Sequence, residues 1–215
     1  MPTFYVAMVV KDYGIVDLLL LLCYSCKMSS PGLEVFARSI TPEDPTFAEC
    51  LPKGVFNRLE DIPADFLAEL GAEHIVVDFD GTLIPRGRRT LEISPDTLEW
   101  LELITQDTRF KSLSMATDGG GFDTIEDLTR WGVKLDAIYQ PWVIGTDRLI
   151  TKQNASFWRK ILFDKDCLDT PGKVLNIGDS PIHDIVPAQQ EGLQAVLVDR
   201  LEYRFPGFPA KPSFE

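Results

Sequence analysis

The sequence predicts an α/β domain in which helices cover both faces of a central parallel sheet. Apolar runs rich in β-branched residues alternate with amphipathic helical segments along most of the chain, and this order is typical of parallel strands joined by crossover helices. Acidic residues follow two of the apolar runs directly. Because ligands of such sheets gather at the carboxyl ends of the strands, we expect the functional site at that edge.

The composition suits one globular domain with an appended segment. The chain has 215 residues, of which 45% are hydrophobic, and this is enough for a sizeable core. A formal charge of −12 argues against nucleic acid as a partner and against broad binding to an anionic membrane. The four cysteines lack paired metal-binding spacing, so we expect reduced thiols in a cytoplasmic protein. Peripheral contact with a membrane surface stays open.

Three segments are expected along the chain. Residues 1–50 read as an N-terminal extension and linker, residues 51–199 as the α/β domain, and residues 200–215 as a Pro-rich tail. The boundary near residue 50 follows a stretch rich in Pro, Ser, Thr and acids.

The first 27 residues contain an apolar run, Ile15 to Cys23, whose role the sequence leaves open. The run is shorter than the ~20 apolar residues that span a bilayer, so no stable membrane span is expected. Asp12 and Asp17 disfavour a secretory signal. Two alternatives remain: this segment lies upstream of a true start at Met28, or it forms a helix of the protein.

Helix signals are clear at two places. The first helix is expected over residues 61–70, with Asp61 as its N-cap and Gly71 as its C-terminal stop. The second is expected to begin at Ser94-Pro95, because Ser is a favoured N-cap and Pro is favoured at the first helical position. Further strands are expected over 110–117, 135–139, 174–177 and 195–198, and further helices over 123–132, from 154 and up to 192.

The stretch from His74 to Leu83 organises the domain. Its β-branched run Ile75-Val-Val77, closed by a Gly-containing turn, predicts a parallel strand that is buried on both faces. Because side chains alternate along a strand, we expect Asp78 and Asp80 on one side and Phe79 on the other. Two carboxylates at a buried strand end need a compensating cation, and a hard divalent ion with oxygen ligands is the natural candidate.

Three further motifs are expected at the same edge of the sheet. Thr117 ends the second strand, and its hydroxyl can donate to a phosphoryl oxygen. Lys152 stands just before the helix start at Asn154, where an ammonium group and a helix N-terminus could both face an anion. Asp179 and Asp184 follow another apolar strand. Each motif alone has an ordinary reading, such as a turn-capping Thr, a solvated Lys or an acidic turn, but their order is much more specific.

These motifs resemble those of a known superfamily. Asp78-Phe-Asp-Gly-Thr-Leu83 resembles the first motif of the haloacid dehalogenase (HAD) superfamily, and Thr117, Lys152 and the pair Asp179 and Asp184 resemble its other three motifs. The resemblance implies a HAD-like Rossmannoid sandwich around a central parallel sheet.

The resemblance extends to one branch of that superfamily. The short spacing between motifs leaves no room for a cap domain, and with the lead-in over 51–71 the chain looks like subfamily IIIA, which includes phosphatidylglycerophosphate phosphatases. Asp118 stands where that branch often has Asn, and Gln153 stands where it commonly has Pro. These two departures leave the substrate open.

The resemblance also implies a role for each motif residue. Asp78 would be the nucleophile and form an aspartyl-phosphate, and Asp80 would be the general acid and base. Thr117 and Lys152 would hold the transferring oxygens. The implied ligands of a Mg²⁺ ion are Asp78, Asp80 through its carbonyl, Asp179 and Asp184, the last of which orients the metal shell.

The function expected from these residues is Mg²⁺-dependent hydrolysis of phosphate monoesters. The partner would be a phosphorylated small molecule, a phospholipid headgroup such as that of phosphatidylglycerophosphate, or a phosphoprotein. Arg86, Arg88 and Arg89 follow the nucleophile strand and could bind a second anionic group, unless they form a solvated loop. Two alternatives are a phosphotransferase (mutase), which normally needs a cap, and a noncatalytic scaffold, which the filled catalytic positions disfavour.

Overall fold

The computed structural model describes residues 50–84, 93–118, 134–145 and 148–199. Their centre is a six-stranded sheet in which every pairing is parallel. The strands stand in the order β1 (Val55–Phe56), β8 (Gln194–Val198), β7 (Val174–Gly178), β2 (His74–Asp78), β3 (Ser112–Ala116) and β4 (Ala137–Tyr139). The predicted parallel sheet is therefore confirmed.

Strand β2 is central in this sheet, as its apolar sequence predicts. All five of its residues are buried, and it pairs with β3 on one side and β7 on the other. In the register with β3, Asp78 stands beside Ala116, so Thr117 follows at the same edge of the sheet. Asp179 follows β7 at that edge too. The carboxyl ends of three adjacent strands thus bring the motif residues close together.

The first predicted helix begins later than the sequence suggests. Residues Leu59–Asp61 form a 3-10 turn (η2), and the α-helix α3 covers only Ala64–Glu69. Asp61 is therefore not the N-cap. The N-cap is Pro63, whose backbone is extended, and a proline also disfavours the helical conformation in the residue before it. The predicted stop is correct, since Gly71 follows the helix with φ 75°.

The second predicted helix, α4 (Pro95–Gln106), begins where the sequence places it. The Ser94 hydroxyl accepts a hydrogen bond from the backbone N–H of Thr97 at 3.1 Å, so Ser94 is the N-cap. One face of the helix is buried. From that face Trp100 donates its indole N–H to the carbonyl of Ile62 at 2.8 Å, which joins α4 to the segment ahead of α3.

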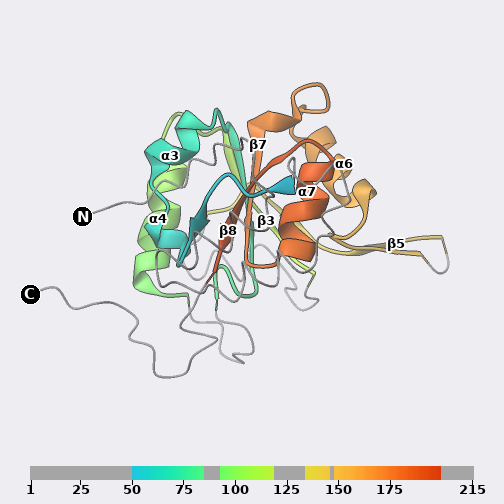
Figure 1. Ribbon diagram of the computed structural model, residues 1–215, viewed down its shortest axis with the longest axis horizontal. Coiled ribbons are helices and arrows are strands. Elements are labelled where there is room, and N and C mark those ends of the chain that lie inside the picture. Colours follow the sequence, from blue (N-terminus) through green and yellow to red (C-terminus); the bar gives the residue numbers. More distant parts are fainter. Residues whose placement is uncertain (1–49, 85–92, 119–133, 146–147, 200–215) are drawn as a thin grey trace, which may run out of the picture.

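The two faces of the sheet are covered by different helices (Figure 1). Ile75 and Val77 point to the face that packs with η2, α3 and α4. Val76, between them, packs on the other face with α6 (Ala155–Asp164) and α7 (Val186–Gln190). Burying each such side chain contributes about 1.5–3 kcal/mol, so β2 ties the two layers together.

A hairpin that the sequence analysis did not predict leads into α6. Strands β5 (Trp142–Ile144) and β6 (Arg148–Ile150) form a separate antiparallel pair that extends away from the main sheet (Figure 1). Gly145, with φ 67°, stands at the turn. Trp142 stacks on Phe157 of α6, with ring centroids 5.6 Å apart, and this contact holds the base of the hairpin. The hairpin sets the direction from which the chain approaches Lys152.

Several sequence predictions fall outside the described residues. They are the N-terminal extension with its apolar run, the arginine-rich loop, the helix over 123–132 and the Pro-rich tail. Among the helices of the described ranges, none combines the length and apolar character that crossing a bilayer requires.

A candidate metal and phosphate site

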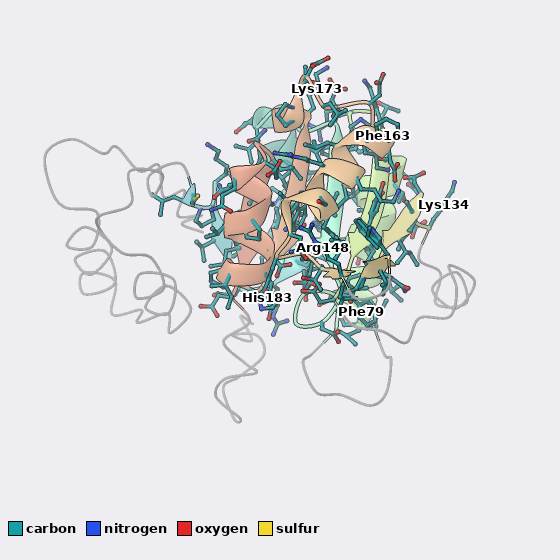
Figure 2. All side chains as sticks on the ribbon, turned by 90° about the vertical axis from the view of Figure 1, so that its right-hand side faces the viewer. Phe79, Lys134, Arg148, Phe163, Lys173 and His183 are labelled. Atoms are coloured by element: carbon teal, nitrogen blue, oxygen red, sulfur yellow. The ribbon has the colours of Figure 1, made fainter. Side chains whose placement is uncertain are left out.

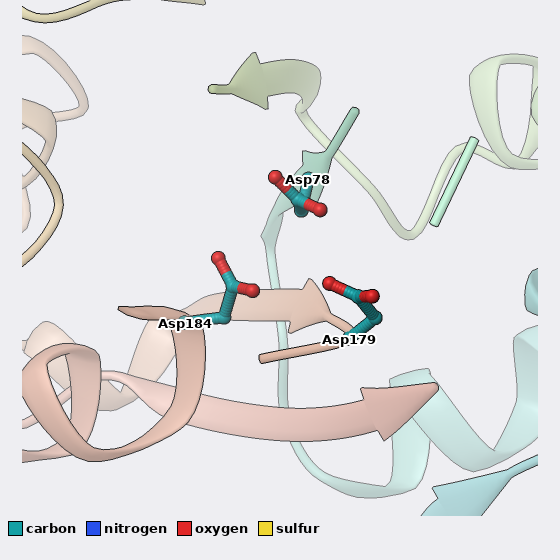
Figure 3. Close-up of side chains that lie close together, drawn as sticks. All are labelled: Asp78, Asp179 and Asp184. Carbon is teal, nitrogen blue, oxygen red and sulfur yellow. The ribbon is translucent and has the colours of Figure 1, made fainter. Parts of the chain in front are cut away.

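Three aspartates converge at the carboxyl edge of the sheet. Asp78 ends β2, Asp179 directly follows β7, and Asp184 lies in the π-helical turn η4 (Pro181–Ile185). One carboxylate oxygen from each lies within 4.8 Å of the other two (Figure 3). The sequence predicted these three residues as metal ligands, and the structure brings them together.

Asp184 reaches this site because Gly178 leaves space for it. A Cβ atom at Gly178 would lie 2.3 Å from the Asp184 carboxyl carbon, closer than real contacts allow. The Ser180 backbone N–H donates to Asp184 Oδ2 at 2.9 Å. Buried Asn176 donates its side-chain amide to the Asp184 carbonyl at 2.9 Å. The glycine and these two hydrogen bonds fix the turn that presents the carboxylate.

Lys152 is buried between two of the aspartates. Its ammonium Nζ donates to Asp78 Oδ1 and to Asp184 Oδ1, each at 2.6 Å, and its side chain is 4% exposed. Burial alone would lower the pKa of Lys152, but the charges of Asp184 and Asp78 outweigh burial and raise it. The lysine therefore stays charged. Its place just before α6 agrees with the sequence prediction, and its direct contact with the predicted nucleophile is new.

The surroundings of Asp78 act on its pKa in opposite directions. Burial raises its pKa, the nearby charge of Asp184 raises it further, and Lys152 opposes both without cancelling them. The Thr82 hydroxyl donates to Asp78 Oδ2 at 3.2 Å. Counted as ionised groups, the three carboxylates and the one ammonium group give a formal charge of −2. One divalent cation would balance that charge, and carboxylate oxygens are its preferred donors.

Asp80 does not join this group of carboxylates. Strand β2 ends at Asp78, and the N–H groups of Leu83 and Ile84 both donate to the carbonyl of buried Phe79. Asp80 therefore lies in a turn beyond the strand, and the expectation that it shares a face with Asp78 stays a prediction. The Asp80 side chain is exposed, while its predicted contact with a metal through its carbonyl stays a prediction.

Thr117 follows β3, at the edge of the sheet where the aspartates lie. It is fully buried, and its backbone N–H donates to the carbonyl of Tyr139 at 3.0 Å. This bond continues the pairing of β3 with β4 and fixes the residue at the edge of the sheet. The structure thus places Thr117 in the predicted region, and its role in binding phosphate stays a prediction. Arg86, Arg88 and Arg89 lie outside the described residues.

Asp118 and His183 join this site although the sequence analysis gave them no role. Asp118 Oδ1 accepts the backbone N–H of Lys152 at 2.9 Å, and its Oδ2 lies 3.0 Å from His183 Nδ1. His183 is partly exposed at the surface (Figure 2). Asp118 was noted only as a departure from a family pattern. No local signal joins it to a residue 65 positions away, so the contact becomes visible only in the fold.

Comparisons with known proteins bear on the fold alone. No family model matches the sequence, and no curated protein matches it either. Among solved structures, the chain is similar to an uncharacterized protein from Listeria monocytogenes serotype 4b, with a TM-score of 0.50 and 20% sequence identity. The match covers 65% of this chain and 84% of that chain. At this identity the likeness supports a shared α/β fold, and it says nothing about activity.

Proposed function

We propose that this protein is a Mg²⁺-dependent phosphomonoester hydrolase that works through an aspartyl-phosphate on Asp78. One observation carries the proposal: Lys152 lies buried between Asp78 and Asp184 where three carboxylates converge. A buried carboxylate that is flanked by a fixed cation can be a nucleophile toward an anionic substrate. The order of motifs supports a capless, HAD-like member of subfamily IIIA, and this finer assignment is part of the proposal.

The donor set suits Mg²⁺. Asp78, Asp179 and Asp184 offer carboxylate oxygens, and their formal charge with Lys152, −2 when all four groups are ionised, would be balanced by a divalent ion. The raised pKa of Asp78 points the same way, because a nearby cation would favour its ionised form. When bound, Mg²⁺ would supply electrostatic stabilisation to the negative charge of the transferring phosphoryl group.

The residues of the chain would act in two half-reactions. In the first, an Asp78 oxygen attacks phosphorus, the bond to the ester oxygen breaks, and Asp80 gives that oxygen its proton. In the second, Asp80 takes a proton from water, the water oxygen attacks phosphorus, and the bond to Asp78 breaks to release phosphate. The proton that Asp80 takes in the second step replaces the one it gave in the first, so Asp80 ends the cycle in its starting form. Lys152 and Thr117 would donate hydrogen bonds to the phosphoryl oxygens.

The substrate would carry a phosphate monoester and a second anionic group. Phosphatidylglycerophosphate has this chemistry, and so do some phosphorylated metabolites and acidic phosphoproteins. Arg86, Arg88 and Arg89 directly follow the segment that carries Asp78 and Asp80, and they would bind the second group.

The proposal is tested with the purified full chain and p-nitrophenyl phosphate. We expect hydrolysis that needs Mg²⁺, stops with a chelator and returns when Mg²⁺ is restored. Asp78→Asn should abolish turnover and keep the fold, because Asn matches the shape of Asp but is a poor nucleophile and a weaker ligand. Asp169→Asn, at an exposed position, is the matched control and should leave the rate unchanged.

Two results would contradict the proposal. Substantial Mg²⁺-dependent hydrolysis by Asp78→Asn would exclude Asp78 as the nucleophile. A wild-type protein that binds Mg²⁺ but hydrolyses none of a broad panel of phosphorylated metabolites, lipids and phosphoproteins would favour the noncatalytic alternative.

A further inference from the structure

We infer that Asp118 is a positioning residue for Lys152, and that His183 and Gln153 support it. Asp118 follows Thr117 at the end of β3. One of its carboxylate oxygens binds the backbone N–H of Lys152, and the other contacts the ring of His183, the residue before Asp184. We call Asp118, His183 and Gln153 the clasp. The Asp118 carboxylate thus connects the end of β3 to the segment that carries Lys152 and to the turn η4 that carries Asp184.

The donors and acceptors of the clasp fit one arrangement of protons. The Asp118 carboxylate can only accept, so His183 Nδ1 carries a hydrogen and donates to it across 3.0 Å. The side-chain amide nitrogen of Gln153 lies 3.1 Å from the other ring nitrogen of His183 and donates to it. A neutral imidazole satisfies both contacts at once. The clasp therefore holds through hydrogen bonds and needs no charge on His183.

The clasp matters because Lys152 has a long, flexible side chain that must reach two partners. Its Nζ lies 2.6 Å from both Asp78 and Asp184, and this geometry depends on where its backbone stands. The backbone is held on both sides: Asp118 binds its N–H at 2.9 Å, and the indole N–H of buried Trp158 binds its carbonyl at 2.6 Å. Without Asp118, the Lys152 backbone keeps the hydrogen bond from Trp158 to its carbonyl but loses the one at its N–H.

Removing the clasp should lower catalytic activity more than it lowers protein stability. The Asp118 and His183 side chains are 28% and 38% exposed, so solvent can replace their hydrogen bonds when the clasp is removed. A shift of about 1 Å in a catalytic group can nevertheless lower a rate about 100-fold. Because the reasoning rests on the proposed function, the experiment must separate a failure of the clasp from a failure of that function.

The test measures kcat, KM, inhibition by orthovanadate and thermal stability in clasp variants. Asp118→Ala should lower kcat by about 100-fold and weaken orthovanadate inhibition, with a small change in melting temperature. Asp118→Asn should recover most of the loss, because its amide oxygen still accepts the Lys152 N–H. Its amide nitrogen can donate to His183 Nδ1 once the ring proton moves to Nε2 and the Gln153 amide turns its oxygen toward that nitrogen. Gln153→Ala removes only the outermost contact of the clasp, so its loss should be smaller than that of Asp118→Ala. Asp169→Asn, at an exposed position outside the clasp, is the control and should leave all four quantities unchanged. A purely structural role would instead lower the melting temperature and the active fraction, leaving the orthovanadate inhibition constant unchanged.

His183 provides a second, milder test in case Asp118→Ala fails to fold. His183→Ala leaves the bond between Asp118 and Lys152 in place but removes its support, so its loss of kcat should be smaller. His183→Asn should recover activity, because its amide nitrogen can take the place of ring Nδ1.

The possible outcomes distinguish a failure of the clasp from a failure of the proposed function. An active wild type with an unimpaired Asp118→Ala variant would overturn this inference and leave the proposed function standing. If Asp118→Asn is as impaired as Asp118→Ala, the charge of Asp118 matters and its hydrogen bond to Lys152 does not, which also overturns it. An inactive wild type would contradict the proposed function and this inference with it.

Discussion

Gly178 should be the residue in this site that tolerates change least, although it has no functional group. A Cβ atom there would lie 2.3, 2.4 and 2.6 Å from three atoms of the Asp184 side chain. Ordinary contact begins at 3.4 Å, so in Gly178→Ala the Asp184 carboxylate must move by about 1.1 Å. The backbone of η4 on one side and Lys152 on the other leave it little freedom to move without losing its partners.

The magnitude follows from this displacement. A shift of about 1 Å in a catalytic group lowers kcat/KM by about 100-fold, which corresponds to ~2.7 kcal/mol of transition-state stabilisation. Overpacking a close-packed site costs a further ~1–3 kcal/mol of folding free energy. Loss of correct support for a metal ligand should weaken Mg²⁺ affinity by about 10–100-fold.

The assay compares Gly178→Ala with Gly172→Ala in steady-state kinetics, Mg²⁺ titration and thermal unfolding. Gly172 lies in the short 3-10 turn η3 (Pro171–Lys173), and an added Cβ there meets nothing within 4 Å, so this control should resemble the wild type. In an Asp184→Gly background the clash disappears, and Gly178→Ala should cost much less stability there. Wild-type kinetics and Mg²⁺ affinity in a folded Gly178→Ala variant would refute the reasoning.

Three other perturbations test the charges. Lys152→Met should lower the melting temperature in the presence of a chelator, because it leaves two buried carboxylates without their cation at a cost of about 3–5 kcal/mol. Added Mg²⁺ should restore much of this stability. No response to Mg²⁺ would contradict the metal assignment. Burial lowers the pKa of His74 below its usual 6.5, so the folded state binds fewer protons and stability should fall as the pH drops below that value. His74→Asn should lose this dependence in melts at about pH 7.5 and about pH 5.5, and an unchanged dependence would exclude His74 as its source. Replacing Arg86, Arg88 and Arg89 with Ala should lower kcat/KM by about tenfold, or ~1.4 kcal/mol, for a doubly anionic substrate only; equal losses on p-nitrophenyl phosphate would indicate a structural role.

Local sequence signals predicted the helices well where a cap and a buried face agree. Ser94-Pro95 places the start of α4 because both residues favour that position on their own. Asp61 misled the analysis, since an acidic N-cap was given more weight than Pro63, which keeps the chain extended for two more residues. The short hairpin strands β5 and β6 were missed because three residues each give too little periodicity to be recognised.

Within the site, sequence order could place residues at the edge of the sheet but could not say which ones touch. Asp78 ends β2 and Asp179 directly follows β7, so their meeting follows from the parallel topology, whereas the place of Asp184 depends on the turn η4. The end of β2 at Asp78 is set by the turn after it and not by the strand pattern, so the sequence could not say that Asp80 lies in that turn. The bond between Lys152 and Asp118 depends on how the hairpin enters α6, which is a property of packing.

The position of β2 between β3 and β7 has a consequence for folding. His74 pairs with Val174, one hundred residues later in the chain, so closing this contact requires ordering a long intervening segment. During synthesis on the ribosome, β2 would emerge long before β7 and expose the unpaired edge of a strand with an apolar centre that can pair with other chains. Proteins dominated by such distant pairings fold slowly. We therefore expect productive refolding to compete with aggregation, and its yield to rise as the protein concentration is lowered.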